Sequence, residues 1–262
     1  MDRGYVLHSY PYRETSLILQ AWTEKHGRLG IVAKGARRPK SAARAVLVPF
    51  QLLSLDWFGR GELRTLKTAE PAAPAIPLRG QNLLSAFYLN ELLLKLTTRD
   101  DPHEGLFAAY DTAITELREL SRKTGDGPSF PRDRNEGPSP VFGIEPTLRR
   151  FELRLLQELG YALELAREAG THAPIAAERE YLYVLERGAI PAPREGETPA
   201  NAVKLRGLTL LDLDSGRLED ASTVAQAKQL MRLLINHSLN GQELATRAMV
   251  RDLQRLEDPE AP

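Results

Sequence analysis

A cluster of positive side chains near the N-terminus is the clearest chemical feature of this 262-residue chain. The stretch "KGARRPKSAAR" contains no acid and five cations, Lys34, Arg37, Arg38, Lys40 and Arg44. Phosphate oxygens attract Lys and Arg with little geometric demand, and counterion release drives such binding. Gly35 lets the chain bend sharply, and Pro39 disfavours helix at the residue before it. The stretch predicts a cationic loop for a polyanion. The alternative is an ordinary solvated surface loop.

The distribution of charge along the chain points the same way. The whole chain is neutral, with 35 Lys or Arg and 35 Asp or Glu. Residues 1–80 hold 13 basic and 6 acidic side chains, a net charge of +7, so the remainder carries −7. Such asymmetry between the parts of a chain is a sign of a polyanion partner. Arg64 and Lys67 are expected to assist the cationic loop.

Aromatic residues accompany these cations and allow a second mode of contact. An aromatic ring exposed on a strand near cations can stack on a nucleic-acid base. Most of the seven aromatic residues between Tyr5 and Phe58 are expected in a core instead, with Trp22 and Phe50 facing inward. Trp57 and Phe58 are adjacent, so they face opposite sides of a strand and one of them should be exposed.

Motifs for catalysis or metal binding are missing from the sequence. The five histidines have no metal-ligand spacing, and the chain contains no cysteine for a disulfide or a thiolate zinc site. It also lacks the GxxxxGK[ST], GxGxxG and GxSxG patterns. We therefore predict a binding protein that is not an enzyme and uses no cofactor or metal. No stretch approaches the roughly 18 apolar residues of a membrane span, and no signal peptide is recognised, which favours the cytoplasm.

The first 78 residues read as the element that positions the cationic loop. Five short runs rich in Val, Leu, Ile and aromatic residues are separated by glycines, and "GELRTLKT" alternates as a strand does. Five short antiparallel strands in this length favour a five-stranded OB-fold barrel. We predict a DNA-binding domain over 1–78.

The rest of the chain reads mainly as helical, which makes the fold α+β with several domains. A helical bundle is predicted over 79–165, with a flexible insert at 121–146 that is rich in Gly, Pro and Ser. Residues 166–221 read as a small irregular α/β region with a hairpin near Asp214–Gly216. Two C-terminal helices over 222–258 are expected to pack on the helical domain.

A second group of cations lies on a helix of that domain. The stretch "TLRRFELRLL" places arginines beside an apolar stripe, and the residues of interest are Arg149, Arg150, Phe151 and Arg154. Arginines that flank an apolar groove can receive an acidic peptide tail ending in an aromatic residue. The alternative is an amphipathic helix with a basic outer face.

Four long motifs resemble those of the bacterial RecO recombination mediators. They are "VLHSYPYRETSLILQAWTEKHGRLGIVAKGARRPKS", "LVPFQLLSLDWFGRGELRTLKTAE", "FYLNELLLKL" and "LRRFELRLLQELGY", which agree in order and spacing from about residue 4 to 161. The stretch "GQELATRAMVRDL" is similar to the last helix of the family, more loosely. The resemblance implies an OB barrel, a helical bundle and a C-terminal region.

What the resemblance implies for function is DNA repair and homologous recombination without catalysis. Members bind single- and double-stranded DNA, anneal complementary strands, engage the acidic C-terminal tail of single-strand DNA-binding protein, and work with RecR to load RecA. The cytoplasmic protein would then associate with the nucleoid. The rival hypothesis is a protein–protein adaptor whose basic OB loop binds an acidic protein.

Carried over to this chain, the cationic loop of the family falls on 34–40 and its tail-binding helix includes 149–153. Two departures follow from the residues. Some members have a four-cysteine zinc module in the C-terminal half, and this chain has no cysteine there. The family's last helix often reads Lys-Ser-Arg where this chain has Ala245-Thr246-Arg247, which removes one cation.

Overall fold

The computed structural model describes residues 1–123, 143–161, 163–193 and 197–257. The chain divides into two compact units, one of residues 1–130 with 243–262 and the other of residues 131–242. The insert predicted at 121–146 lies mostly outside the described residues. Its first three residues belong to a helix, as do its last three. The boundaries of the four domains predicted from the sequence stay predictions.

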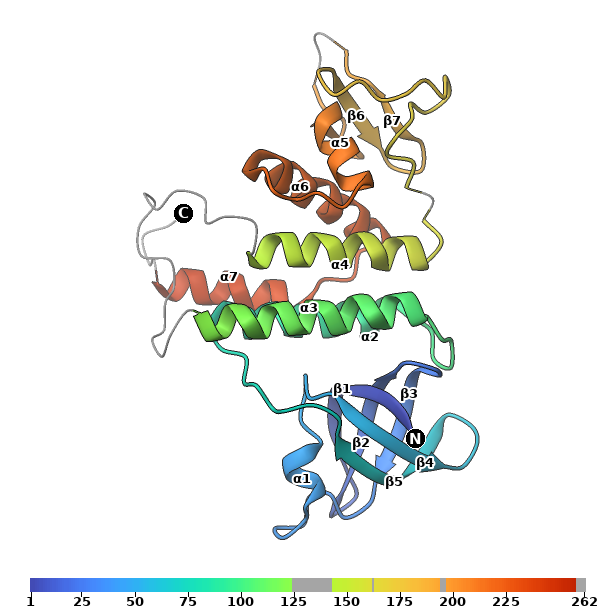
Figure 1. Cartoon of the computed structure of the whole chain (residues 1–262), viewed down its shortest axis with the longest axis vertical. Helices are drawn as coiled ribbons and strands as arrows, with labels where there is room; N and C mark the ends of the chain where they lie inside the picture. Colours follow the sequence, from blue (N-terminus) through green and yellow to red (C-terminus); the bar gives the residue numbers. More distant parts are fainter. Residues whose placement is uncertain (124–142, 162, 194–196, 258–262) are drawn as a thin grey trace. The chain divides into compact units, whose positions relative to one another are not determined.

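The N-terminal unit begins with a closed five-stranded barrel (Figure 1). Its strands follow one another in the order β1-β2-β3-β5-β4, with β3 and β5 parallel and all other pairs antiparallel. The strands are β1 (Asp2–Tyr12), β2 (Ser16–Thr23), β3 (Gly27–Ala33), β4 (Leu53–Phe58) and β5 (Leu63–Pro71). The short helix α1 (Ala43–Val46) lies between β3 and β4. The predicted OB-fold barrel is confirmed.

The barrel core follows from alternation along the strands. Leu19, Leu29, Ile31, Leu53 and Leu55 are fully buried inside it, and burial of each such side chain stabilises the fold by about 1.5–3 kcal/mol. Trp22 and Phe50 are buried, as expected, but Trp22 faces away from the barrel interior, because its strand neighbour Ala21 belongs to the barrel core. Of the adjacent aromatic pair on β4, Phe58 is exposed and Trp57 packs partly on the core, which confirms that the pair divides between the two faces.

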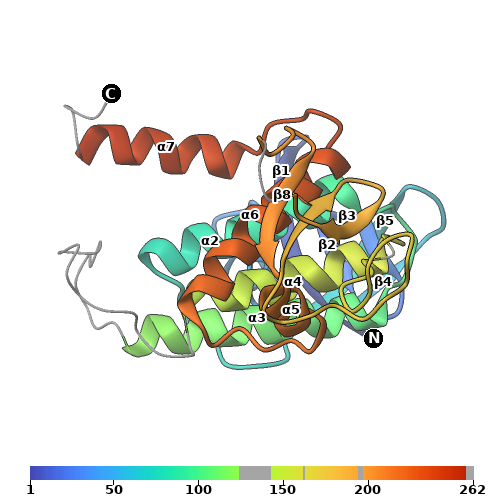
Figure 2. The same cartoon turned by 90° about the horizontal axis from the view of Figure 1, so that it is seen from above.

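Three helices complete this unit and form one layer, with α2 between α3 and α7 (Figure 2). They are α2 (Gly80–Leu96), α3 (Glu104–Lys123) and α7 (Ala245–Glu257). The first turn of α7 has backbone N–H groups without partners in its own helix. The carboxylate of Glu91 on α2 accepts hydrogen bonds from the N–H groups of Ala245 and Thr246, at 2.8 and 2.9 Å. This long-range cap fixes the C-terminal helix to α2.

Buried polar contacts fix the barrel to this helical layer. The Asn90 side chain on α2 donates to the carbonyl of Leu7 at 2.8 Å and accepts from the Tyr110 hydroxyl on α3. The Tyr5 hydroxyl donates to Asp111, and Arg118 donates to the carbonyl of Phe50. Burial, followed by the hydrogen bond to Asp111, raises the pKa of Tyr5. The phenol therefore stays protonated and serves as a donor.

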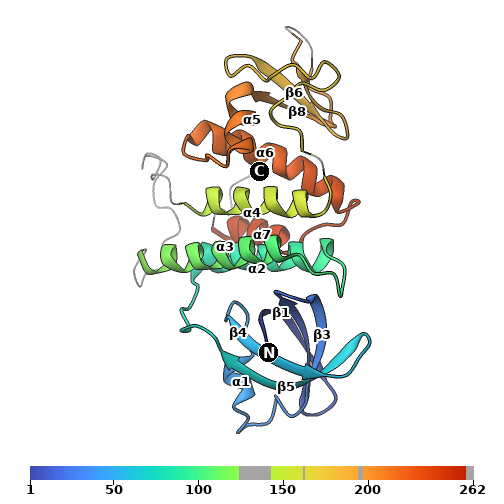
Figure 3. The same ribbon diagram turned by 45° about the vertical axis from the view of Figure 1, so that its right-hand side comes forward.

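The second unit combines a small sheet with three helices, in which α6 packs against α4 and α5 (Figure 3). The sheet has the order β7-β6-β8, from β6 (Glu180–Val184), β7 (Gly188–Pro191) and β8 (Ala202–Arg206). The helices are α4 (Ile144–Glu158), α5 (Gly207–Asp214) and α6 (Ala221–Ser238). Lys228 of α6 forms an ion pair with Glu145 of α4, at 2.7 Å.

Two expectations for the C-terminal half were wrong. The hairpin predicted near Asp214–Gly216 is the end of helix α5, because Leu210 and Leu213 are buried three residues apart while Leu208 is exposed. The region predicted over 166–221 is a small α/β region, as expected, but the part read as irregular holds the three strands of the sheet. Its strands are only 4 or 5 residues long, too short to show a periodicity in the sequence.

No helix in the described part of the chain is long and apolar enough to cross a membrane.

Replacing Asn90 with Ala should destabilise the N-terminal unit by about 2–4 kcal/mol, because it leaves a buried carbonyl and a buried hydroxyl without their shared partner. Urea denaturation followed by circular dichroism measures the change. Asn201→Ala, at an exposed loop position, is the matched control and should change stability by less than about 0.5 kcal/mol. Equal stabilities of the two variants would contradict the assignment.

Candidate nucleic-acid interface

The predicted cationic segment forms an exposed connection between β3 and β4. Lys34, Arg37, Arg38 and Lys40 lie in its turns, and Arg44 lies on the single turn of α1, so the structure brings the five cations to one connection. Gly35 has a positive φ of 69°, which a glycine adopts without strain. Ala36 beside it is buried in the barrel core. The loop is thus anchored to the barrel through Ala36 while its cations are exposed.

Hydrogen bonds hold this loop in a defined shape. The backbone N–H of Arg37 donates to the carbonyl of Thr15 at 2.9 Å. The Arg37 guanidinium donates to the carbonyls of Arg13 and Glu14 at 3.5 and 3.4 Å. The loop after β3 is therefore fixed to the turn between β1 and β2. Arg13 of that turn lies over the ring of Tyr12, 5.2 Å from its centre.

The five loop cations have no acidic partner in the part of the chain that the structure describes. Their charges are therefore available to an anion from outside. Arg64 and Lys67, which were predicted to assist the loop, differ from the loop cations because both have acidic partners. Arg64 pairs with Asp100, and Lys67 pairs with Asp56 at 3.0 Å. The hydrogen bond from Lys67 holds the pKa of Asp56 below its usual value. The structure thus separates unpaired cations on the loop from paired ones on β5.

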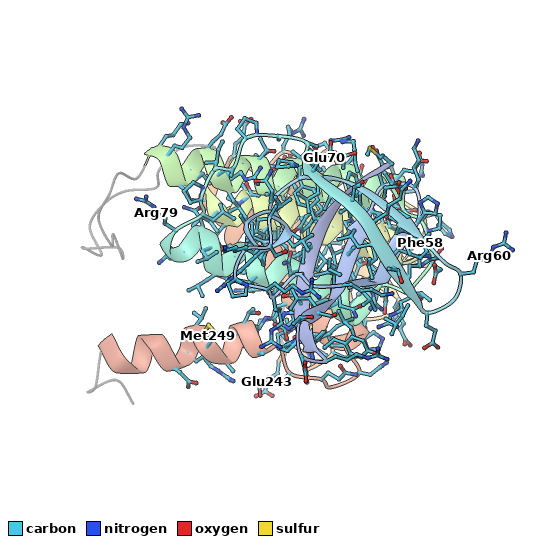
Figure 4. The ribbon with its side chains drawn as sticks, turned by 90° about the horizontal axis from the view of Figure 1, so that it is seen from below. Phe58, Arg60, Glu70, Arg79, Glu243 and Met249 are labelled. Carbon is cyan, nitrogen blue, oxygen red and sulfur yellow. The ribbon has the colours of Figure 1, made fainter. Side chains whose placement is uncertain are left out.

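Two exposed aromatic groups on the barrel are suited to stacking on bases. Tyr10 of β1 is 48% exposed, and its ring lies 4.4 Å from that of His8 in an edge-to-face arrangement. Phe58 is 57% exposed at the end of β4, and Arg60 follows in the hairpin that leads to β5; both point away from the barrel (Figure 4). The sequence did not single out Tyr10, since strand alternation alone does not tell which face of a barrel stays uncovered.

The arginine cluster predicted for an acidic tail is divided between the inside and the outside of the second unit. Arg149 is only 5% exposed, and its guanidinium binds both carboxylate oxygens of Glu152, at 2.8 and 2.7 Å. Phe151 is also buried. Arg150 is half-buried, and Arg154 is exposed and pairs with Glu158. Two of the four predicted residues thus belong to the interior of the protein.

In the described residues, no three His, Asp or Glu side chains gather in a geometry that could hold a metal ion.

Replacing Arg149 with Ala should reduce the stability of the protein by about 3–5 kcal/mol, because the buried carboxylate of Glu152 would lose the guanidinium that binds both of its oxygens. Arg154→Ala is the control on the same helix and should cost no more than about 1 kcal/mol, as expected for an exposed pair. Thermal and urea denaturation compare the two. A stable Arg149→Ala variant would show that this pair does not hold the helix in place.

Comparisons with known proteins match both ends of the chain. The family model described as Recombination protein O N terminal matches residues 1–75, and that described as Recombination protein O C terminal matches residues 140–248. The DNA repair protein RecO of Azoarcus sp. (strain BH72) is 45% identical over 253 residues, 97% of this chain and 96% of that protein. The proteins of the same name from Nitrosospira multiformis and Laribacter hongkongensis are 44% and 40% identical, over 97% and 98% of this chain and 95% and 96% of theirs. These matches confirm the resemblance drawn from the sequence motifs.

Proposed function

Because the chain belongs to the RecO family of DNA repair proteins, we propose that it binds single- and double-stranded DNA through its N-terminal barrel and anneals complementary strands. The observation that carries this proposal is the loop of five exposed cations between β3 and β4, which have no acidic partner among the described residues. Such a surface neutralises phosphates and releases their counterions.

Annealing needs two strands to be held without their bases being occupied. Contacts to phosphate position a strand but do not read its sequence. A barrel that binds phosphates through Lys34, Arg38 and Lys40 therefore leaves base edges free to pair with a second strand. The protein is proposed to act by binding alone, without bond cleavage or nucleotide hydrolysis, and to associate with the nucleoid in the cytoplasm.

The Arg38→Ala/Lys40→Ala variant should bind single-stranded DNA more weakly and with a smaller salt dependence. Each lost phosphate contact lowers the slope of log affinity against log salt by about 0.7, so the pair should lower it by up to about 1.4. Fluorescence anisotropy of a labelled oligonucleotide at several salt concentrations measures both quantities. Arg37 is left in place because it fixes the loop to the neighbouring turn.

The control is the Arg187→Ala/Arg232→Ala variant, which removes the same charge from exposed positions in the second unit. It should keep the wild-type slope. Unchanged affinity and slope in a folded Arg38→Ala/Lys40→Ala protein would exclude the loop as the DNA site. Annealing of complementary oligonucleotides without ATP separates the proposal from the adaptor hypothesis, because an adaptor for acidic proteins would bind its partner but not anneal DNA.

Recruitment to coated DNA is the second part of the proposal. We propose that the acidic C-terminal tail of single-strand DNA-binding protein docks on the outer side of α4 at Arg150 and Arg154, and that the protein works with RecR to promote RecA loading. Family membership supports these partners, and the exposed guanidinium of Arg154 supports the place. Arg149 and Phe151, buried in the same helix, would then support the site without touching the tail.

An acidic peptide that ends in an aromatic residue should bind the Arg150→Ala/Arg154→Ala variant roughly five- to twentyfold more weakly than the wild type, since each exposed charge pair contributes up to about 1 kcal/mol. Isothermal titration calorimetry measures the affinities. Arg232→Ala, on α6 of the same unit, should bind as the wild type does. A peptide with the aromatic residue removed tests the apolar part of the contact. Equal affinity of wild type and double variant would exclude this side of α4.

A further inference from the structure

Two arginines face each other at the edge of the barrel, away from the cationic loop. Arg28 lies near the start of β3, and Arg99 lies just beyond the end of α2, and the two residues form an isolated parallel bridge. The backbone N–H of Asp100 donates to the carbonyl of Arg28 at 3.0 Å, so this short segment lies beside β3 like an added strand. Like charges directly opposite one another on paired strands destabilise them.

The surrounding groups hold both guanidiniums but do not neutralise them. Arg28 donates to the carbonyl of Thr97 at 2.7 Å. Arg28 and Arg99 each also donate to the same side-chain oxygen of Gln20, at 3.4 Å in both cases. No carboxylate lies within ion-pair distance of either arginine among the residues described, because the neighbouring Asp100 pairs with Arg64. Two positive groups therefore converge on one neutral amide.

The local packing shows that the closeness of the two segments is built into the fold. A Cβ atom on Gly27 would lie only 2.0 Å from the carbonyl oxygen of Asp101, so the approach requires a glycine. Burial, followed by the charge of Arg99, lowers the pKa of Arg28. The Nε atom of Arg28 is buried and has no hydrogen-bond partner in the described structure. An anion at this place would relieve the repulsion between the two guanidinium groups.

We propose that Arg28 and Arg99 form a second phosphate site, and that its occupant is a phosphodiester group of a single DNA strand. This inference rests on the proposed function and adds a site to it. Arginine is suited to the task because its planar fork binds two phosphate oxygens at once. Gln20 orients the two guanidinium groups toward a common point.

The outer face of the barrel connects this site with the cationic loop. The pairing of β1, β2 and β3 places Tyr10 opposite Ile18 and Ile18 opposite Val32, and the last two side chains are partly exposed. From Arg28 to Lys34 the distance along β3 is roughly 20 Å at the usual rise of a strand. A single strand would run along β3 between two phosphate sites and stack a base on Tyr10, a combination typical of single-strand binding surfaces.

The Arg99→Gln variant of the full-length protein tests the site. Arg99 is exposed, and its replacement removes a like-charge contact, so the melting temperature should stay the same or rise. Affinity for a fluorescein-labelled oligothymidine should fall roughly three- to tenfold, with a decrease in salt slope of about 0.7 for the lost phosphate. Arg232→Gln is the matched control and should leave both unchanged. A wild-type affinity and slope in Arg99→Gln would overturn the proposal.

Combination with the loop variant separates this inference from the proposed function. Arg38→Ala/Lys40→Ala/Arg99→Gln should show a salt slope lower by a further 0.7 or so than the loop variant alone. If the loop variant loses affinity and Arg99→Gln does not, the second site fails while DNA binding by the loop stands. If the wild type binds no oligonucleotide, the proposed function itself fails. If millimolar inorganic phosphate stabilises wild type but not Arg99→Gln, while the oligonucleotide binds both equally, the site takes free phosphate and the assignment to a DNA strand is overturned.

Discussion

The hydrogen bonds of the Asn90 side chain are the contact on which the N-terminal unit depends. One side chain on α2 binds a backbone carbonyl of β1 and a hydroxyl of α3, and all three groups are buried. A buried polar group without a partner costs about 1–3 kcal/mol, so the barrel has one favoured position on the helical layer. The position of α2 in turn determines where the residues just after its end lie. It therefore also determines the bridge between Arg99 and Arg28.

The positive charges of the N-terminal unit fall into two groups, those with an acidic partner and those without one in the described structure. On β5, Arg64 and Lys67 are matched by Asp100 and Asp56, which lowers the energy of the isolated protein and weakens their attraction for a distant anion. On the loop after β3 and at the Arg28–Arg99 bridge, the positive charges form no ion pair within the described structure. Electrostatic attraction of a polyanion depends on the unpaired cations. Cations that are already paired with an acid release fewer counterions when the polyanion binds.

Arg149 and Arg154 show how the same residue type serves different purposes on one helix. Arg149 compensates a carboxylate that is 1% exposed, in a pair whose loss would leave a buried charge. Arg154 lies in solvent, where its pair with Glu158 contributes little to stability and the guanidinium can exchange partners. A contact surface for an acidic partner must be built from exposed arginines such as Arg154. Buried arginines such as Arg149 keep α4 in place.

Features that depend on neighbouring residues could be predicted from the amino-acid sequence. The alternation of apolar residues and the glycines between the runs predicted the five strands of the barrel, and a glycine and a proline predicted a cationic loop after the third. The main helices, including α2 and α4, followed from apolar patterns that extend over several turns. These signals are local, because strand alternation and helix periodicity act within about ten residues.

Features that join distant segments could not be predicted in this way, because they depend on how those segments pack. Part of helix α5 was predicted as a hairpin because a run of leucines interrupted by acids fits both the helix periodicity and the strand periodicity. Packing against α6 selects the helix. The pattern of α4 did not show that Arg149 turns inward, since its position depends on a buried acid and on what covers that face. Arg28 and Arg99 lie 71 positions apart in the chain. Only the closure of the barrel and its attachment to α2 bring the two arginines together. The sequence around either arginine gives no sign of the other, because their closeness depends on packing between distant segments.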